Sequence, residues 1–422
     1  MRGYAEEEES SEMLLSEGFW KRGRSRWMSR RYVFSTILLL GLLGIYWLSS
    51  MSSNESLSPE DVPDESYDEF TTETNNGPIN KNVIDFTSIQ KDNFAFHFNG
   101  SDVMIFLHIQ KTGGTTFGKH LVQDINLESP CSCFKNNPGY LRNNKKKKKK
   151  KRKKKLKCDC FRPGDNSKTW LFSRFSTGWK CGLHADWTEL SACVDPYLSK
   201  TGGPATRRYF YITFLRDPLS RYLSEFRHVQ RGATWRSSRH ICNGRPASAS
   251  EIPSCYEPED NWEDASLEDF MGCPSNLASN RMTRMLADLT LVDCYDTSTM
   301  SKEQRDAILL KSAKENLESM AFFGLTEEQI PSQYLFQKIF NLSFKVNFTQ
   351  NERVQGEATL EELSPEVQKR LKELNHLDLQ LYQFAKELMN TRYRVFKVQD
   401  TEDNNDSESE KDNMNNNPED YQ

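Results

Sequence analysis

Four short apolar runs, separated by helical patterns, are the feature that most constrains the fold of this chain. The runs are rich in β-branched and aromatic residues and fall at 103–109 (VMIFLHI), 170–175, 209–215 (YFYITFL) and 321–325 (AFFGL). Short continuous apolar runs of this kind are typical of strands that are buried on both faces. Because such strands alternate here with helices, we predict an α/β fold with a central parallel sheet flanked by helices.

Two helices have clear start signals. Asp217 followed by Pro218 supplies an N-cap and a proline at the first helical position, which predicts a helix over 217–230. A second helix is predicted over 364–393, with an apolar stripe on one face formed by Val367, Leu371, Leu374, Leu381 and Leu388. Because Asp378 interrupts this short stripe, a core-facing helix is favoured over a dimerising coiled coil.

A membrane segment is predicted near the N-terminus. Tyr32 to Leu48 is a run of seventeen residues without a charge. Six Lys or Arg residues lie directly before it, at 21–31, and none follows until Lys81. The positive-inside rule then predicts a single-pass type II anchor, with 1–31 cytosolic and the rest of the chain lumenal. A cleaved signal peptide is the alternative. It is disfavoured because the run begins some thirty residues into the chain and no clear small-residue cleavage site follows it.

Composition divides the lumenal part into a stem, a domain and a tail. Residues 49–81 are polar and almost lack large apolar residues, so they predict an unfolded stem. One folded domain is predicted over 82–396, and 397–422 is predicted to be an acidic, disordered tail.

The net charge of −4 includes eleven consecutive positive residues at 145–155, so the other 411 residues carry −15. An acidic protein with one basic insert is not the pattern of a nucleic-acid binder.

Cysteines and glycosylation sequons agree with a lumenal domain. The ten cysteines include two CxC pairs, Cys131/Cys133 and Cys158/Cys160. Metal sites more often use CxxC, so disulfides in an oxidising compartment are favoured over a metal site. Asparagine sequons predict a glycoprotein and occur at Asn54, Asn99, Asn341, Asn347 and Asn405.

The first chemical motif follows the first predicted strand. VMIFLHI runs into Gln110-Lys111-Thr112-Gly113-Gly114-Thr115-Thr116-Phe117, a glycine-bearing turn with hydroxyls and one lysine before an expected helix. Backbone N–H groups and a helix N-terminus in such a turn suit a phosphate, and the lysine adds a point charge. The lysine precedes the glycine pair, whereas in a nucleotide triphosphatase loop it follows the last glycine. Taken alone, the motif favours an ordinary strand-to-helix turn over a phosphate-binding turn.

A second motif favours the phosphate interpretation. Phe214-Leu215-Arg216-Asp217-Pro218 again joins a strand to a capped helix, and Ser224 follows about two turns later. The two motifs together resemble the pair of loops with which sulfotransferases bind 3′-phosphoadenosine 5′-phosphosulfate (PAPS). By that resemblance, Lys111 and its turn hold the 5′-phosphosulfate, while Arg216 and Ser224 hold the 3′-phosphate.

Three longer stretches narrow the resemblance to one family. LFSRFSTGWKCGLHADWTEL (171–190), SEFRHVQRGATW (224–235) and NLASNRMTRMLADLTLVDCY (276–295) resemble heparan-sulfate 6-O-sulfotransferases, over roughly residues 100–396 apart from the lysine insert. The resemblance implies a P-loop-like sulfotransferase fold, a Golgi membrane enzyme, PAPS as the donor and heparan sulfate as the acceptor. It implies no metal.

The resemblance also implies roles for individual residues. His184 would be the general base that takes the proton of the glucosamine 6-hydroxyl, and Lys111 would assist the departing phosphate. The acceptor would contact Lys157, Arg174, Trp179, His184, His228 and Trp235. A later loop, at a shorter spacing than in the family, would supply Thr349, Gln350 and Arg353 to the donor. The other donor contacts would be His108, Ile109, Gln110, Lys111, Thr112, Gly113, Gly114, Thr115, Thr116, Arg216 and Ser224.

The implied reaction is an in-line sulfuryl transfer, in which the protein positions groups and stabilises charge. A histidine base with its ordinary pKa, near 6.5, would suit this chemistry at neutral pH. Alternatives are another lumenal carbohydrate sulfotransferase and a lumenal kinase or P-loop phosphotransferase, which would need carboxylates for magnesium. A non-catalytic heparin-binding membrane protein is a third; it would leave the LHADW stretch unexplained.

Overall fold

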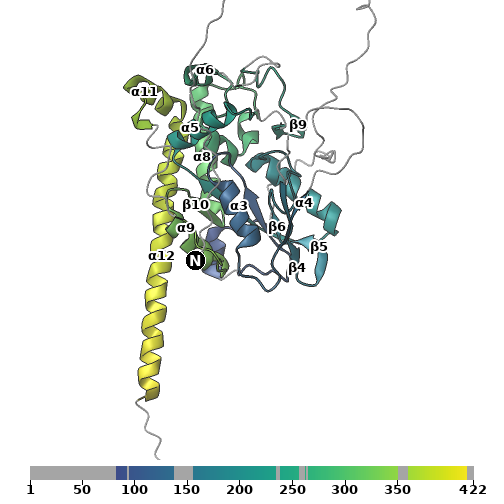
Figure 1. Cartoon of the computed structure of the whole chain (residues 1–422), viewed down its shortest axis with the longest axis vertical. Coiled ribbons are helices and arrows are strands. Elements are labelled where there is room, and N and C mark those ends of the chain that lie inside the picture. Colours follow the sequence, from purple (N-terminus) through teal and green to yellow (C-terminus); the bar gives the residue numbers. More distant parts are fainter. Residues whose placement is uncertain are drawn as a thin grey trace, which may run out of the picture. The chain divides into compact units, whose positions relative to one another are not determined.

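A four-stranded parallel sheet forms the centre of the fold, in the order β10-β7-β1-β6 (Figure 1). β1 (Asp102–Leu107) and β7 (Arg208–Leu215) pair in register from Asp102↔Arg208 to Leu107↔Thr213. β6 (Leu171–Phe172) lies beside β1, and β10 (Phe322–Leu325) lies beside β7. The prediction of a parallel sheet built from the four apolar runs is confirmed.

The computed structural model describes residues 82–92, 95–136, 155–233, 238–255, 262, 265–349 and 360–415. These residues belong to one compact unit, 66–422. The predicted cytosolic tail, membrane segment (32–48) and stem (49–81) lie outside the described residues, as does the lysine run except Lys155. Among the residues described, no helix combines the length and apolar character needed to cross a membrane.

One predicted strand is shorter than expected. We predicted a strand over 170–175, whereas β6 ends at Phe172. The chain turns there because the N–H of Ser173 donates to Oγ of Ser176 (3.0 Å) and the N–H of Ser176 donates back to the oxygen of Ser173 (3.1 Å). The turn leads into the stretch 174–184, which supplies several site residues.

Helices flank the sheet and follow its strands. α3 (Gly114–Gln123) follows β1, and α5 (Pro218–Val229) follows β7 with Asp217 as its N-cap, as predicted. α4 (Trp187–Gly202) opens with a capping box in which Asp186 and Glu189 satisfy each other's backbone N–H groups. The remaining helices before residue 360 are α2 (Phe86–Asp92), α6 (Leu267–Gly272), α7 (Arg281–Leu286), the 3₁₀ turn η2 (Leu289–Val292), α8 (Lys302–Ser319) and α9 (Gln329–Phe340).

The single helix predicted over 364–393 is in fact two helices, α11 (Pro365–Leu374) and α12 (His376–Asn415). The chain breaks at Asn375, whose N–H caps α11. Asp378, in the first turn of α12, is fully buried and accepts hydrogen bonds from the N–H groups of Met282 (3.0 Å) and Thr283 (2.8 Å) at the start of α7. The break therefore lets a carboxylate of one helix cap another.

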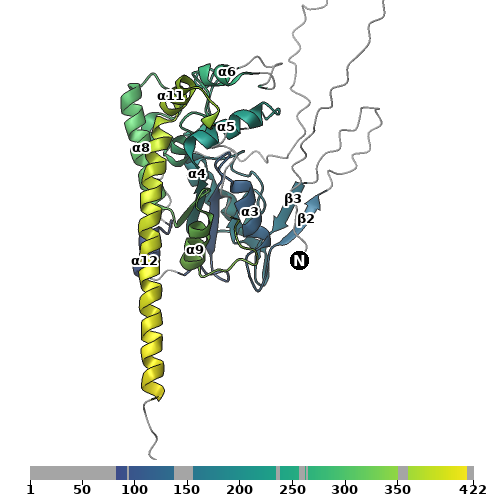
Figure 2. The same cartoon turned by 60° about the vertical axis from the view of Figure 1, so that its left-hand side comes forward.

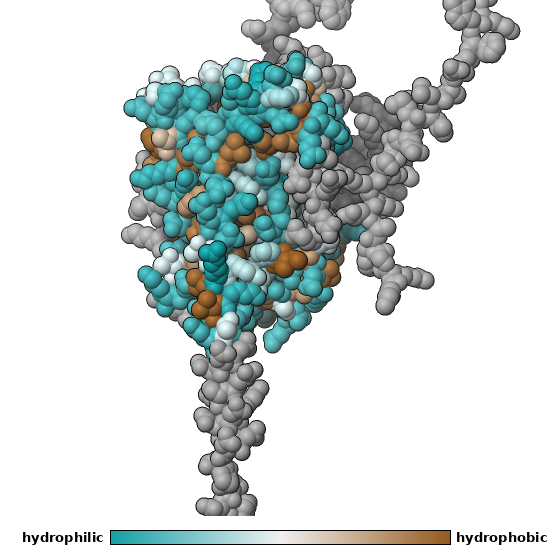
Figure 3. All heavy atoms as spheres, turned by 90° about the vertical axis from the view of Figure 1, so that its left-hand side faces the viewer, coloured by the Kyte–Doolittle hydropathy of each residue, from teal (hydrophilic) through white to brown (hydrophobic). Residues whose placement is uncertain are grey.

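The apolar stripe of these helices faces the core, as predicted. Leu371 and Leu381 are 0% exposed, and α12 packs against α7, α8 and α9. The face on which α12 lies is mainly hydrophilic, with scattered apolar residues (Figure 3).

Our domain boundary at 396 is too early. α12 continues without interruption to Asn415, so residues 397–415 are helical and not a disordered tail. Asp400 ties the extension to the domain because it accepts a hydrogen bond from the hydroxyl of Tyr334 (2.6 Å) and pairs with Lys338. These two partners lie on α9, far away in the sequence, and no local pattern near 400 indicates them.

All ten cysteines form disulfides, which confirms that prediction. The pairs are Cys131–Cys160, Cys133–Cys158, Cys181–Cys193, Cys242–Cys294 and Cys255–Cys273. The first two brace a hairpin of β2 (Ser132–Asn136) and β3 (Lys155–Asp159), which extends from the side of the domain (Figure 2). Short antiparallel pairs complete the fold: β4 (Phe161–Arg162) with β5 (Asp165–Thr169), and β8 (Ile241–Cys242) with β9 (Arg245–Pro246).

Candidate active site

The turn after β1 has a backbone that suits an anion. Lys111 (φ 66°) and Gly113 (φ 77°) both adopt the left-handed region, and α3 begins immediately afterwards at Gly114. No side chain in the described chain caps this helix, and its first turn holds no acidic residue. The N–H groups and positive end of the helix dipole are thus available to a phosphate, in keeping with the predicted cradle.

Gly114 is needed because His108 lies directly beneath the start of α3. A Cβ atom at position 114 would come within 2.4 Å of Cδ2 of His108. His108 is buried, and its ring stacks on Phe106 (centroids 5.4 Å apart). Burial and the nearby His184 and Arg174 hold the pKa of His108 well below its usual value, so its ring is neutral. Ile109, Gln110 and Thr112 are also buried, so they contribute mainly backbone to the turn.

The second motif lies beside the first because β1 and β7 are neighbours. Arg216 follows the last residue of β7, and its Nη1 donates to the main-chain oxygen of Lys111 (3.3 Å). Its buried Nε has no hydrogen-bond partner among the described residues. Ser224 lies two turns along α5 and is half-buried. The structure thus brings the Lys111 and Arg216 motifs together.

Two residues that sequence reasoning missed join the motifs from the end of β10. Thr326 Oγ lies 2.8 Å from the oxygen of Thr112 and 2.9 Å from the oxygen of Leu215. Glu327 accepts the N–H of Asp217 (3.1 Å) and lies 3.9 Å from Nε of Arg216. The available signal was their position, directly after the predicted strand 321–325.

His184 lies at a strained position in the loop before α4, with φ 54°. Its Nδ1 is 3.0 Å from the main-chain oxygen of His108, which can only accept. Nδ1 therefore carries the hydrogen, and Nε2 carries the lone pair. Burial lowers the pKa of His184 to about 3, so the value near 6.5 expected from the sequence is wrong for the free protein. The ring is neutral at physiological pH, as a proton acceptor must be.

An aromatic and cationic wall adjoins His184. The ring of Trp179 lies 4.6 Å from that of His184 and 5.7 Å from that of His108. Arg174 stacks over Trp179 at 5.5 Å, and its Nη1 lies 3.3 Å from Oγ of Thr115 in the first turn of α3. The predicted residues Arg174, Trp179 and His184 therefore lie together beside the cradle.

Positive charge is concentrated around Lys111. Burial first, then Arg231 and Arg216, lower the pKa of Lys111. The pKa of His228 is also lowered, by burial, Lys111 and Arg231. His228 is thus close to Lys111 and Arg231. Arg231 is a further basic residue that sequence reasoning missed, although it lies within the 224–235 stretch.

Other predicted residues are not joined to this cluster. Lys157 is exposed on β3, near the ring of Phe134, and only its neighbour Cys158 touches the site region, by donating its N–H to the oxygen of Phe175 (2.7 Å). Thr349 is exposed, and the described contacts do not connect it with the turn. Thr116 lies in the first turn of α3, with its N–H donated to Gly113. Trp235, Gln350 and Arg353 lie outside the described residues.

A cavity of about 420 Å³ opens beside Gln110. The buried Oε1 of Gln110 has no hydrogen-bond partner within the described chain. Polar residues from two further segments line the same cavity, among them Arg239, His240 and Arg281. Such a cavity is within the size range of ligand sites, about 300–1,000 Å³. No group of three His, Cys, Asp or Glu in the described residues could hold a metal ion.

Comparison with known proteins identifies relatives of the chain. A model of the sulfotransferase family matches residues 191–385. Heparan-sulfate 6-O-sulfotransferase 2 of Danio rerio is 53% identical over 310 residues, which are 72% of this chain and 62% of that protein. Heparan-sulfate 6-O-sulfotransferase 3-B of Danio rerio is 48% identical over 349 residues, 82% of this chain and 78% of that protein. Heparan-sulfate 6-O-sulfotransferase 2 of Homo sapiens is 52% identical over 305 residues, 72% of this chain and 47% of that protein.

Proposed function

The chain belongs to the heparan-sulfate 6-O-sulfotransferase family, and on this basis we propose that it transfers a sulfuryl group from PAPS to the 6-hydroxyl of glucosamine residues in heparan sulfate. The observation that carries the proposal is the meeting of three predicted elements at one end of β1 and β7. The turn with Lys111 touches Arg216, and the same turn begins at His108, whose carbonyl oxygen orients His184.

The donor site is assigned to the two strand ends. The uncapped start of α3 and Lys111 would hold the phosphosulfate, and Arg216 with Ser224 would hold the 3′-phosphate. Arg216 fits this assignment, since a guanidinium can donate two parallel hydrogen bonds to a phosphate. PAPS supplies the activated sulfuryl group; the protein's part is to hold it and to stabilise charge on the leaving oxygen, for which Lys111 is placed.

Nε2 of His184 is assigned as the atom that accepts the proton of the attacking hydroxyl. The hydrogen bond from Nδ1 to His108 fixes the tautomer, so the lone pair on Nε2 can take the proton of the attacking hydroxyl. A pKa of about 3 in the free protein makes a weak base. Anionic phosphates and sulfates bound nearby would favour the protonated ring and raise that pKa, so the base becomes stronger when both substrates are present.

The acceptor is assigned to the wall beside His184. Trp179 offers an apolar ring face to a sugar, and Arg174 and His228 offer cationic or hydrogen-bonding groups to its sulfates. Lys157 and Trp235 stay predictions for the outer part of this site, and Thr349, Gln350 and Arg353 stay predictions for the donor loop. The polar cavity beside Gln110 is assigned to a neighbouring sugar unit of the acceptor.

The cellular setting is also part of the proposal. The apolar run 32–48, with basic residues before it, would anchor the chain as a type II protein of the Golgi membrane. The five disulfides support an oxidising lumen for the domain.

One experiment tests the proposed activity. The full chain is incubated with labelled PAPS and 6-O-desulfated heparin, and the product is digested to disaccharides. We expect label on the glucosamine 6-position, with turnover unaffected by EDTA. Label at another position would assign a different carbohydrate sulfotransferase. Calorimetric binding of heparin without binding of PAPS would instead favour a non-catalytic heparin-binding protein.

A further inference from the structure

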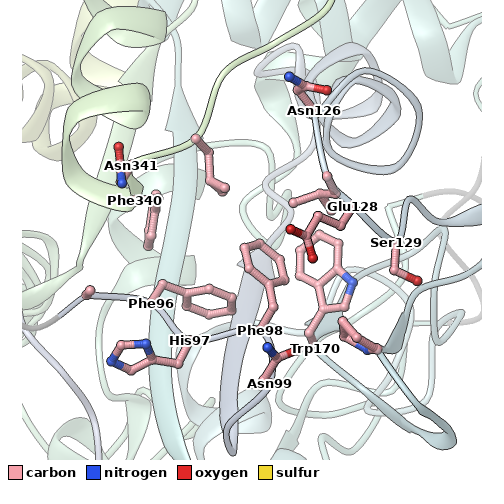
Figure 4. Close-up of a pocket in the computed structure, with 14 residues that line it drawn as sticks. Phe96, His97, Phe98, Asn99, Asn126, Glu128, Ser129, Trp170, Phe340 and Asn341 are labelled. Atoms are coloured by element: carbon pink, nitrogen blue, oxygen red, sulfur yellow. The ribbon is translucent and has the colours of Figure 1, made fainter.

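A second cavity, of about 450 Å³, lies at the end of the sheet opposite the candidate active site. It is lined by residues 95–99, which precede β1, whereas the phosphate turn follows β1. Its wall is largely aromatic: Phe96, Phe98, Trp170 and Phe340 (Figure 4). The catalytic assignment uses none of these residues.

Two glycosylation sequons lie on the rim of this one cavity. They are Asn99-Gly100-Ser101 and Asn341-Leu342-Ser343, and both asparagines are exposed and line the cavity. Figure 4 shows the two side chains on different sides of the aromatic cluster. Although the two asparagines are 242 positions apart in sequence, the fold places both beside the same apolar wall.

The two asparagines differ in structural role. Asn341 ends α9 in the left-handed conformation (φ 51°), which asparagine tolerates better than most residues, so its identity has a structural explanation. Asn99 lies in a tight turn held by the N–H of Gly100 and the oxygen of His97 (3.1 Å). This turn needs no asparagine, because Asn99 has neither a positive φ nor a side-chain hydrogen bond among the described residues.

We propose that Asn99 carries an N-linked glycan whose first N-acetylglucosamine lies in this cavity against Phe98. Nδ2 of Asn99 would form the bond to C1 of the sugar, and the bond from C1 to the diphosphate of its lipid carrier would break. The amide proton would go to a base of the host's glycosyltransferase. The proposal rests on the lumenal location of the domain, which its disulfides support.

The cavity suits a sugar with one apolar face and several polar groups. Phe98 is only partly buried and is held in place edge-to-face by Phe96 (4.9 Å) and Trp170 (5.0 Å). Its position directly before Asn99 puts a rigid ring beside the attachment point. Glu128, whose carboxylate points toward the aromatic cluster in Figure 4, offers an acceptor for the acetamide N–H.

The test uses full-length protein made in secretory cells that produce only high-mannose glycans. Mass spectrometry of the glycopeptide should find Asn99 occupied. Ser101→Ala removes the sequon but keeps Asn99, and should lower Tm by about 2 °C. Trimming the wild type with an endoglycosidase that leaves one N-acetylglucosamine should leave Tm unchanged, because the seated sugar remains.

Matched controls distinguish a specific effect of the sugar in this cavity from a general effect of glycans. Ser343→Ala removes the sequon on the other side of the cavity and should leave Tm unchanged. Phe98→Leu keeps an apolar side chain but removes the ring, so adding Ser101→Ala to it should cost no further Tm. An unoccupied Asn99 would overturn the proposal. So would an equal loss of Tm when Ser101→Ala is introduced into the wild type and into the Phe98→Leu variant. Transfer from PAPS at 25 °C should be equal in all variants, so failure here is distinct from failure of the proposed function.

Discussion

Nδ1 of His184 lies 3.0 Å from the main-chain oxygen of His108, so the loop before α4 is attached to the start of the turn that follows β1, the proposed phosphate-binding turn. Both residues sit where the chain leaves regular structure, β1 ending at Leu107 and α4 starting at Trp187. One hydrogen bond thus sets the tautomer of the assigned base and its position relative to the donor site.

Replacing His184 with asparagine should lower turnover strongly while preserving the fold. Asparagine tolerates the positive φ at this position better than alanine does, and it cannot accept a proton at neutral pH. We expect kcat to fall by about 10²- to 10⁴-fold, with the Kd for PAPS unchanged. Steady-state kinetics and calorimetry make the comparison; a variant that keeps more than about a tenth of wild-type kcat would show that His184 is not the base.

Arg216 and Lys111 should affect different kinetic constants. Arg216→Ala should weaken PAPS binding by roughly 10- to 100-fold, because a charged hydrogen bond to a ground-state phosphate is lost. Lys111→Asn, which tolerates φ 66°, should mainly lower kcat, by about 10²-fold, because the charge matters most as the leaving oxygen becomes negative. Arg216→Lys is the control that keeps charge without the two-pronged contact. Equal losses of binding in both variants, with kcat untouched, would contradict the assignment.

Acid should destabilise the domain through its buried neutral histidines. Burial lowers the pKa of both His184 and His240 to about 3, against about 6.5 when unfolded. The unfolded chain therefore binds more protons between these values, and stability falls as pH drops from about 6.5 toward 3. Each histidine contributes at most about 1.4 kcal/mol per pH unit.

His240 allows this effect to be measured away from the assigned catalytic residues. His240→Asn keeps a residue suited to φ 52° and removes one titrating group. Its Tm should decline less steeply than that of the wild type between pH 6.5 and pH 4. Parallel declines would mean that His240 does not titrate with a lowered pKa. Above pH 7 the slopes of the two proteins should agree.

The lysine run should act on the acceptor and not on the donor. It joins β2 to β3, whose end residues Asn136 and Lys155 are register partners, so removal of 145–154 still leaves a chain that can connect them. We expect deletion to raise the KM for heparan sulfate several-fold at low salt and to flatten its salt dependence, since charges are screened beyond about 8 Å at physiological ionic strength. A Gly/Ser segment of equal length should behave like the deletion. An acceptor KM unchanged across the salt series would make the run a passive loop.

The elements that could be predicted from the sequence are those with local signals. The four buried strands, the Asp217-Pro218 helix start and the strand-to-helix turn at Lys111 all rest on contiguous residues. Each is present, although the strand predicted over 170–175 ends at Phe172. The break at Asn375 could not be predicted, because its cause is the burial of Asp378 against α7, almost a hundred residues earlier in the chain. The helix beyond Phe396 depends in the same way on contacts from Asp400 to α9.

The same distinction between local signals and long-range contacts applies to the residues of the site. Lys111, Arg216 and His184 belong to motifs that can be recognised in sequence, and the parallel pairing of β1 and β7 accounts for the contact between the first two. Thr326 belongs to no motif, and Arg231 lies in the 224–235 stretch without a role that the stretch itself indicates. The fold brings Thr326 to Thr112 and Arg231 to the surroundings of Lys111. The pKa of His184 was missed because burial, which no neighbouring residue reveals, dominates it.

The paired disulfides of the β2–β3 hairpin also determine how the domain bears mechanical load. If a bound polyanion pulls on the lysine run, the force acts first on Asn136 and Lys155. Three residues along each strand toward the domain, the Cys133–Cys158 disulfide joins the two strands covalently. The Cys131–Cys160 disulfide, two residues beyond it, is a second covalent link between the two segments. Tension then opens only the pairs of the β2–β3 ladder outside this disulfide. Cys158, whose N–H donates to the oxygen of Phe175 beside the aromatic wall, stays in register. A polyanion bound to the run would therefore leave the geometry of the candidate active site undisturbed.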